Sequence, residues 1–235
     1  MSDRIRVTLA PGWLLHRYPY RETSIIAEVF TRDHGRIGLV ARGARTSGRR
    51  SGPVIGLFAP LLFSFRQGGE LASLDKAESA GDGYRLTGEA FLAGSYVNEL
   101  LLRLLPRGDA APEIYALYEE TLRGLEDDTA RSVRRFEGRV LSLLGYLPSL
   151  TKDASGRVLE PDRFYRYDQD LGLVAARQGE STEVLLAIAR EEYADESVLK
   201  AAARLFRTIV AAHLHGRPLR SLDVARAIGS RGTGV

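Results

Sequence analysis

The amino-acid sequence predicts a multi-domain α+β protein, in which a small five-stranded β-barrel precedes a mostly helical region. Three observations support this prediction. The first 77 residues read as short strands separated by turn residues, helical spacing of apolar residues begins after Gly81-Asp82-Gly83, and basic charge is concentrated near the start of the sequence. We therefore expect one domain over residues 1–80 and a second over residues 81–235.

Five segments have the β-branched, aromatic and partly alternating composition of strands: residues 4–18, 23–32, 36–41, 56–66 and 70–78. The alternation is clearest in TSIIAEVFTR, where Ile25, Ala27 and Val29 share one face. Pro60 lies inside the fourth segment and indicates a bend or an edge there. Five short strands in about 75 residues predict a closed or partly open barrel. Four aromatic residues are expected in its core: Phe30, Phe58, Phe63 and Phe65.

The helical region contains four longer segments in which apolar residues recur at three- and four-residue steps: residues 86–106, 111–127, 129–148 and 196–216. Thr129 is a candidate N-cap of the third segment, and Gly145 marks its end. A short helix is expected around residues 221–229. Between the third and fourth long helices, residues 155–177 predict a β-hairpin that turns at Asp168–Gly172.

The composition excludes several classes of site. The chain has no cysteine, which excludes disulfides and thiolate metal sites and fits a reducing cytoplasm. The uncharged stretch Ser51–Phe65 is too short and too interrupted by proline and glycine to span a membrane. None of the three lysines follows a glycine, so there is no Walker-type phosphate loop. We found no catalytic constellation and expect no enzyme, although a site assembled from His16, His34 and nearby acids stays open as an alternative.

Basic charge is segregated along the chain. Residues 1–66 carry 11 arginines and four acidic residues, whereas the remainder of the chain carries more acidic than basic side chains. The stretch from His34 to Gly69 contains six arginines and no acid, and it includes the glycine-rich segment VARGARTSGRRSG at residues 40–52. Arginine pairs well with phosphate oxygens, and glycine lets the backbone approach a ligand closely. The N-terminal part therefore predicts a surface for a polyanion.

Aromatic residues lie among these arginines. Tyr18 and Tyr20 lie beside Arg17 and Arg21 in a polar turn, where they are as compatible with base stacking as with a structural role. A basic groove with stacking rings is typical of sequence-tolerant binding to single-stranded nucleic acid. The simpler alternative is that the arginines keep a loop soluble and the rings fill the barrel core.

Several segments of the sequence resemble the bacterial recombination mediator RecO. The N-terminal segments are LLHRYPYRETSIIAEVFTRDHGRIGLVARGAR and GLFAPLLFSFRQGGELASLDKAE. The likeness continues in the same order through GSYVNELLLRLLP, RRFEGRVLSLLGYLPSL, RFYRYDQDLGLVA and GRPLRSLDVARAI, so that it covers nearly the whole chain. The ARGAR part of the arginine segment, Ala41–Arg45, is the part shared with RecO proteins.

The resemblance implies an N-terminal OB barrel followed by a helical domain. It also implies binding of single- and double-stranded DNA, annealing of complementary strands, and binding to the acidic C-terminal tail of single-strand-binding protein (SSB). Together with RecR, such a protein promotes loading of RecA on SSB-coated DNA in the cytoplasm, associated with the nucleoid. Many RecO proteins carry a four-cysteine zinc module where this chain has its 150–177 segment, so we expect no zinc and no other cofactor here.

The expected site residues follow from the charge pattern and the resemblance together. Phosphate and base contacts are expected from Arg17, Tyr18, Tyr20, Arg21, Arg36, Arg42, Arg45, Arg49, Arg50 and Arg66. The SSB tail is expected on the segment SVRRFEGRVLSLLGY, where an apolar face of Val133, Phe136, Val140 and Leu143 adjoins a basic edge of Arg131, Arg134, Arg135 and Arg139. A plain amphipathic core helix is the alternative for this segment. An RNA-binding accessory factor in translation or ribosome assembly is the alternative for the whole chain.

Overall fold

The computed structural model describes residues 5–44, 56–214 and 219–221. Contacts divide them into two compact units. The first comprises the described residues of Met1–Arg123 together with residues 219–221, and the second comprises those of Gly124–Pro218. The predicted boundary between residues 80 and 81 separates strands from helices, whereas contacts group the first two helices with the strands.

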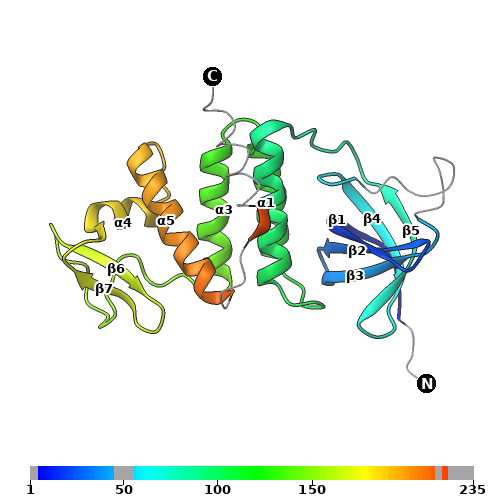
Figure 1. Cartoon of the computed structure of the whole chain (residues 1–235), viewed down its shortest axis with the longest axis horizontal. Helices are drawn as coiled ribbons and strands as arrows, with labels where there is room; N and C mark the ends of the chain where they lie inside the picture. The colour runs from blue at the N-terminus through cyan, green and yellow to red at the C-terminus, as the bar shows by residue number, and fades with distance from the viewer. Residues whose placement is uncertain (1–4, 45–55, 215–218, 222–235) are drawn as a thin grey trace. The chain divides into compact units, whose positions relative to one another are not determined.

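Five strands of the first unit form a closed barrel (Figure 1): β1 (Arg6–Tyr20), β2 (Ser24–Thr31), β3 (Gly35–Ala41), β4 (Pro60–Arg66) and β5 (Leu71–Ser79). Their order around the barrel is β1-β2-β3-β5-β4, and only the β3–β5 pairing is parallel. The long strand β1 closes the barrel because its first part pairs with β4 and its second part pairs with β2. The predicted OB-like barrel is therefore confirmed.

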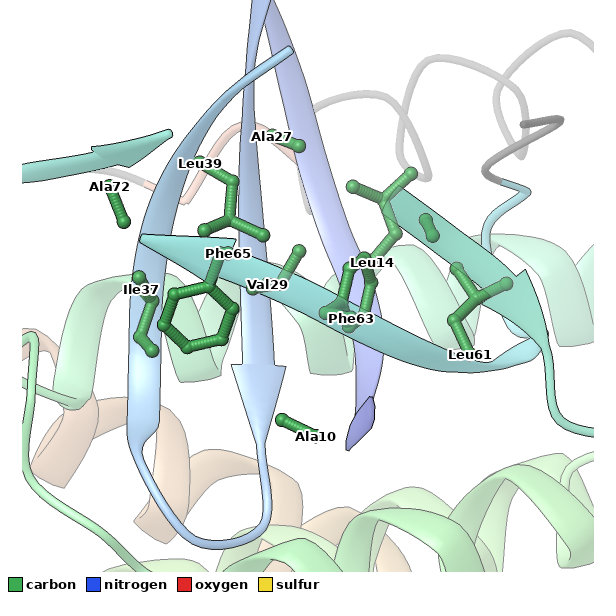
Figure 2. Packing of buried hydrophobic residues seen from close by; sticks show 11 residues of the cluster. Ala10, Leu14, Ala27, Val29, Ile37, Leu39, Leu61, Phe63, Phe65 and Ala72 are labelled. Carbon is green, nitrogen blue, oxygen red and sulfur yellow. The ribbon is translucent and has the colours of Figure 1, made fainter. Parts of the chain in front are cut away.

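The interior of the barrel is filled by inward-facing side chains from all five strands (Figure 2). The central members include Leu14, Val29, Leu39, Phe63 and Phe65. All four aromatic residues expected in the core are buried, but only Phe63 and Phe65 lie in the barrel interior, whereas Phe58 packs against the ring of Phe91. Phe30 faces outward from β2 and packs against the ring of Tyr115, with centroids 5.6 Å apart. Pro60 is the first residue of β4, where its missing N–H disturbs the ladder least.

Two helices belong to the same unit: α1 (Gly88–Leu104) and α2 (Pro112–Gly124). A buried amide joins them to the barrel. Asn98 of α1 donates to the carbonyl oxygen of Leu15 at 3.1 Å and accepts a hydrogen bond from the hydroxyl of Tyr118 at 2.7 Å. Burial of these polar groups is tolerated because each finds a partner. These hydrogen bonds therefore hold α1 and α2 in a defined position against the barrel.

The second unit contains α3 (Thr129–Leu143), α4 (Thr182–Ala189), α5 (Glu196–His213) and a three-stranded sheet of β6 (Phe164–Asp168), β7 (Gly172–Ala176) and β8 (Glu180–Ser181). Strands β6 and β7 pair with Asp168 opposite Gly172, which confirms the predicted hairpin. Helix α3 packs against α5 and buries Phe136 and Phe206. Of the short helix expected around residues 221–229, only Ser221 lies within the described residues.

Two features of the second unit differ from expectation. The N-cap of α3 is Asp128, whose carboxylate accepts the backbone N–H of Arg131 at 3.0 Å, while the expected cap Thr129 donates to the carbonyl of Leu125 instead. Helix α4 was not predicted, because eight residues are too short to show a helical period clearly.

A loop of residues 151–159 precedes the hairpin, and a carboxylate organises it. Asp153 accepts hydrogen bonds from the backbone N–H of Ser155 at 2.8 Å, from the Ser155 hydroxyl at 2.6 Å and from the backbone N–H of Arg157 at 3.0 Å. The bond from the Ser155 hydroxyl and those from the two backbone groups keep the pKa of Asp153 below its usual value. Within the described ranges, no group of three or more histidine or acidic side chains is placed to hold a metal ion.

Candidate nucleic-acid interface

A hollow of about 840 Å³ lies on the barrel where three segments meet. These are the β1–β2 turn at residues 20–24, the end of β3 with Arg42 directly after it, and the segment from Arg66 to Ser73, which comprises the end of β4, the β4–β5 connection and the start of β5. They come together because β3 pairs with β5 and β1 lies between β2 and β4. We call this the first hollow. Loops at this position are the ones that bind oligonucleotides and oligosaccharides in OB folds.

Four of the expected DNA-binding residues line the first hollow: Tyr20, Arg21, Arg42 and Arg66. The guanidinium of Arg21 lies over the Tyr20 ring, 5.2 Å from its centroid, which is within the range of a cation–π contact. Arg66 is half exposed and pairs with Asp75 at 2.8 Å, which holds its guanidinium at the rim. Arg42 is exposed, and no acid of the described residues pairs with it.

The backbone at Arg21 is unusual for a residue with a side chain. Its φ of 52° lies in the left-handed region, which few residues other than glycine adopt. Such a conformation is retained where the surrounding structure requires it, and it is common at ligand-binding turns. Here it brings Arg21 and Tyr20 together at the tip of the β1–β2 turn. The only acid lining the first hollow is Glu22 of the same turn, so the described part of the hollow carries an excess of positive charge.

Arg36 has a different environment from the other expected residues. Its Nη1 donates to the carboxylate of Glu28 at 2.9 Å, and its Nε donates to the carbonyl of Leu105 at 2.9 Å. Arg107 pairs with the other oxygen of the same carboxylate. Only 3% of the Glu28 side chain and 16% of the Arg36 side chain are exposed. This geometry favours a structural role for Arg36.

The remaining expected residues are more scattered. Arg17 is exposed on β1, opposite Ala27. Tyr18 does not line the first hollow; it lies beside His16, with ring centroids 4.4 Å apart. Arg45, Arg49 and Arg50 lie outside the described residues. The sequence also did not identify the β4–β5 connection as part of the site, although Gly68-Gly69 between two strands marked it as a turn.

The four arginines of α3 all have partners inside the second unit. Arg139 makes two bonds to Glu191, at 2.7 and 2.9 Å, and Arg135 lies 3.8 Å from the same carboxylate. Arg134 pairs with the buried Glu137 at 2.7 Å. Arg131 donates to the carbonyl of Tyr193 and pairs with Asp128. The arginines of this edge of α3 are therefore already paired with acidic side chains of the same unit.

The apolar face of α3 is mostly core. Val133, Phe136 and Val140 are buried, and only Leu143, at 44% exposure, is open to a partner. Nearby, burial raises the pKa of Tyr193 to about 12, which reflects the closely packed contact between α3 and the segment that precedes α5. An acidic peptide would therefore meet arginines and the exposed Leu143 here, because the other apolar side chains of this face are buried.

Helices that are both long and apolar enough to cross a membrane do not occur in the described part of the chain.

The profile described as "Recombination protein O N terminal" matches residues 5–81, and the profile described as "Recombination protein O C terminal" matches residues 85–223. A DNA repair protein RecO from Methylococcus capsulatus is 41% identical over 234 residues, which cover 96% of each chain. Another from Alkalilimnicola ehrlichii is 43% identical over 231 residues, 95% of this chain and 92% of the relative. The chain therefore belongs to the RecO family of DNA repair proteins.

Proposed function

We propose that the chain is a recombination mediator that binds single- and double-stranded DNA without sequence specificity and anneals complementary strands. The observation that carries the proposal is the convergence of Tyr20, Arg21, Arg42 and Arg66 on the first hollow, at the loops where OB folds bind nucleic acid. Family membership favours DNA over RNA as the ligand. Arg45, Arg49 and Arg50, in the segment that follows Arg42, extend the proposed phosphate contacts.

The proposed contacts are to the phosphate backbone, which explains why no sequence preference is expected. Two complementary strands repel each other through their phosphates. Arginines that neutralise part of this charge on both strands lower the repulsion and allow base pairing to proceed. The same residues break no covalent bond, and we propose that the chain acts without catalysis. RecO proteins form a family of repair mediators and are not known as enzymes.

We further propose that the chain binds the acidic tail of SSB at α3 and acts with RecR to promote RecA loading. Glu191 supports the choice of α3, because it accepts two hydrogen bonds from Arg139, as a carboxylate of an acidic peptide would. Glu191 is 31% exposed, so a peptide carboxylate can reach the arginines it holds. Leu143 supplies an exposed apolar contact at the end of the same helix.

Strand annealing without ATP or metal, on bare and on SSB-coated strands, tests the mediator function. We expect annealing in both cases. Replacing Arg42, Arg45, Arg49 and Arg50 with alanine should flatten the salt dependence of single-strand binding by up to about 0.7 × 4 log units per log unit of salt. An unchanged slope and affinity would contradict the assignment of these arginines.

The tail site needs a variant that preserves the fold. Arg135→Gln with Arg139→Gln is suitable because Glu191 is partly exposed, whereas Arg134→Ala would leave Glu137 buried without its arginine. We expect weaker binding of a labelled acidic tail peptide in fluorescence anisotropy. Arg123→Gln, on the exposed side of α2, is the matched control and should bind normally. Full binding by the double variant would reject this site.

A further inference from the structure

A second hollow, of about 740 Å³, lies in the first unit and has no assigned role. It is lined by β1 with His16 and Tyr18, by α1, and by four arginines, of which the sequence singled out only Arg36. We propose that it binds a nucleotide unit of a single DNA strand, with the phosphate on Arg103, Arg107 and Arg220 and the base against His16 and Tyr18. The proposal rests on the proposed DNA binding and adds a second site to it.

Three arginines converge on the second hollow from separate parts of the chain. Arg103 lies in the last turn of α1, Arg107 in the connection that follows α1, and Arg220 in the segment 219–221. About a third of the Arg103 and Arg107 side chains is exposed. Arg103 lies 3.6 Å from Glu99, too far for a good hydrogen bond, and no acid of the described residues pairs with the Arg220 side chain. These guanidinium groups have hydrogen-bonding capacity left for a phosphate.

The two carboxylates of the second hollow are already fully engaged. Glu28 is paired with both Arg36 and Arg107. Glu99 accepts the backbone N–H groups of Arg220 and Ser221 at 3.0 and 2.8 Å, and the Ser221 hydroxyl at 2.7 Å. Burial alone would raise the pKa of Glu99, but these hydrogen bonds together with Arg103 hold it below its usual value. Four arginines against two satisfied glutamates leave an excess of positive charge, which suits an anion.

Strand β1 supplies an aromatic pair to the second hollow. His16 and Tyr18 are two residues apart on β1 and so point to the same face of the strand. Tyr18 is 45% exposed, so its ring is accessible to a ligand. Partial burial lowers the pKa of His16, which favours the neutral form of the ring, and a neutral ring is suited to stacking. A base can stack on such a pair while its phosphate contacts the arginines.

The second hollow and the first each share lining residues with a third hollow. A smaller hollow of about 290 Å³ shares Ala72 with the first hollow and shares Arg36 and Arg107 with the second. It runs over the β4–β5 connection at Gln67, Gly69 and Glu70. A single strand that leaves the first hollow can therefore follow this connection to the second. An acidic peptide is the competing ligand, but it would use the arginines and leave the aromatic pair without a role.

The absence of cysteine makes a direct test simple, because one introduced cysteine is the only thiol. Ser95→Cys places a thiol in the second hollow, Ser73→Cys places one in the first, and Ala116→Cys on the exposed face of α2 is the control. Each full-length variant is mixed with an oligo-dT that carries a thiol-reactive disulfide on its backbone. We expect cross-links at positions 95 and 73 and none above background at position 116.

A double variant tests the arginines. Arg103→Gln with Arg220→Gln keeps the Arg220 backbone bond to Glu99, so the wall is preserved. It should lower the salt slope of oligo-dT binding by up to about 1.4 and remove the cross-link at position 95 while position 73 still reacts. Cross-linking at 73 but not at 95 in the parent background would overturn the second site and leave the proposed function intact. A parent protein that does not bind oligo-dT at all would overturn both the second site and the proposed function. If an acidic peptide protects the thiol of the Ser95→Cys variant from alkylation and DNA does not, the second hollow is assigned to a peptide.

Discussion

Arg36 allows structural and DNA-binding roles of an arginine to be separated by experiment. The perturbation is Arg36→Ala. It removes a charged hydrogen bond to Glu28 and a second bond to the carbonyl of Leu105, both at 2.9 Å. Glu28 is 3% exposed and would keep only Arg107 as a partner. The variant is therefore expected to destabilise the barrel and to leave phosphate contacts unchanged.

The size of the effect follows from the burial of the carboxylate. Leaving a buried charge wholly unpaired costs about 3 to 5 kcal/mol, and one hydrogen bond to a charged group contributes about 1.5 to 3 kcal/mol. Because Arg107 remains, we expect a loss of about 2 to 3 kcal/mol in the free energy of unfolding. Arg42→Ala, at an exposed position, should stay within about 0.5 kcal/mol of the wild type.

The assay uses the single tryptophan of the chain. Trp13 lies on β1 and is 2% exposed, so its fluorescence during urea unfolding reports on the barrel. Single-strand binding is measured in parallel over a range of salt concentrations. For Arg42→Ala we expect a salt slope lower by about 0.7 with unchanged stability. For Arg36→Ala we expect an unchanged salt slope with lower stability. An Arg36→Ala variant with wild-type stability and a lower slope would refute the structural role and restore Arg36 as a phosphate contact.

Three further predictions address other parts of the structure. Gly35→Ala should destabilise the barrel in the same Trp13 assay, because φ is 65° and the new Cβ would overlap the Asp109 carbonyl oxygen; wild-type stability would contradict this contact. Tyr118→Phe should cost about 1 to 3 kcal/mol, since it leaves the buried Asn98 oxygen without its donor; an unchanged urea midpoint would show that this bond contributes nothing. Burial raises the pKa of Tyr115 and Tyr193 to about 12, so the unfolded chain loses protons above pH 10 that the folded chain keeps. Stability should therefore fall between pH 10 and 12, and an ultraviolet titration showing both tyrosines ionising at pH 10 in the folded protein would oppose this.

Much of the fold was predictable because the relevant signals are local. Alternation in TSIIAEVFTR reports a strand, and its buried residues Ala27 and Val29 face the barrel interior as expected. Asp168–Gly172 likewise marks a turn by composition alone. The signals fail where an element is short or where two local features compete. Helix α4 is too short for a period, and Asp128 rather than its neighbour caps α3 because its carboxylate reaches the N–H of Arg131.

The candidate site was predictable in composition but only partly in arrangement. Arg21, Arg42 and Arg66 belong to one basic region of the sequence, and barrel closure brings them to one hollow. The pairing of Arg36 with Glu28 is a diagonal contact between adjacent strands, since Glu28 lies opposite Gly38. Arg107 reaches the same carboxylate from 79 residues away in the sequence. Such long-range pairings depend on tertiary structure, and no spacing in the sequence reports them.

The distribution of acids decides how much of the N-terminal charge can act on a ligand. Within the N-terminal quarter, Asp33 pairs with Arg32 and Glu28 pairs with Arg36, so these two arginines contribute little net field. Hydrogen bonding to Arg32 keeps the pKa of Asp33 low, which keeps that pair charged and mutually neutralised. Arg42 has no such partner among the described acids and lies in the first hollow. A count of arginines therefore overstates the size of the basic surface. Because acids neutralise Arg32 and Arg36, the positive charge that remains available to a ligand lies at the loops around the first hollow.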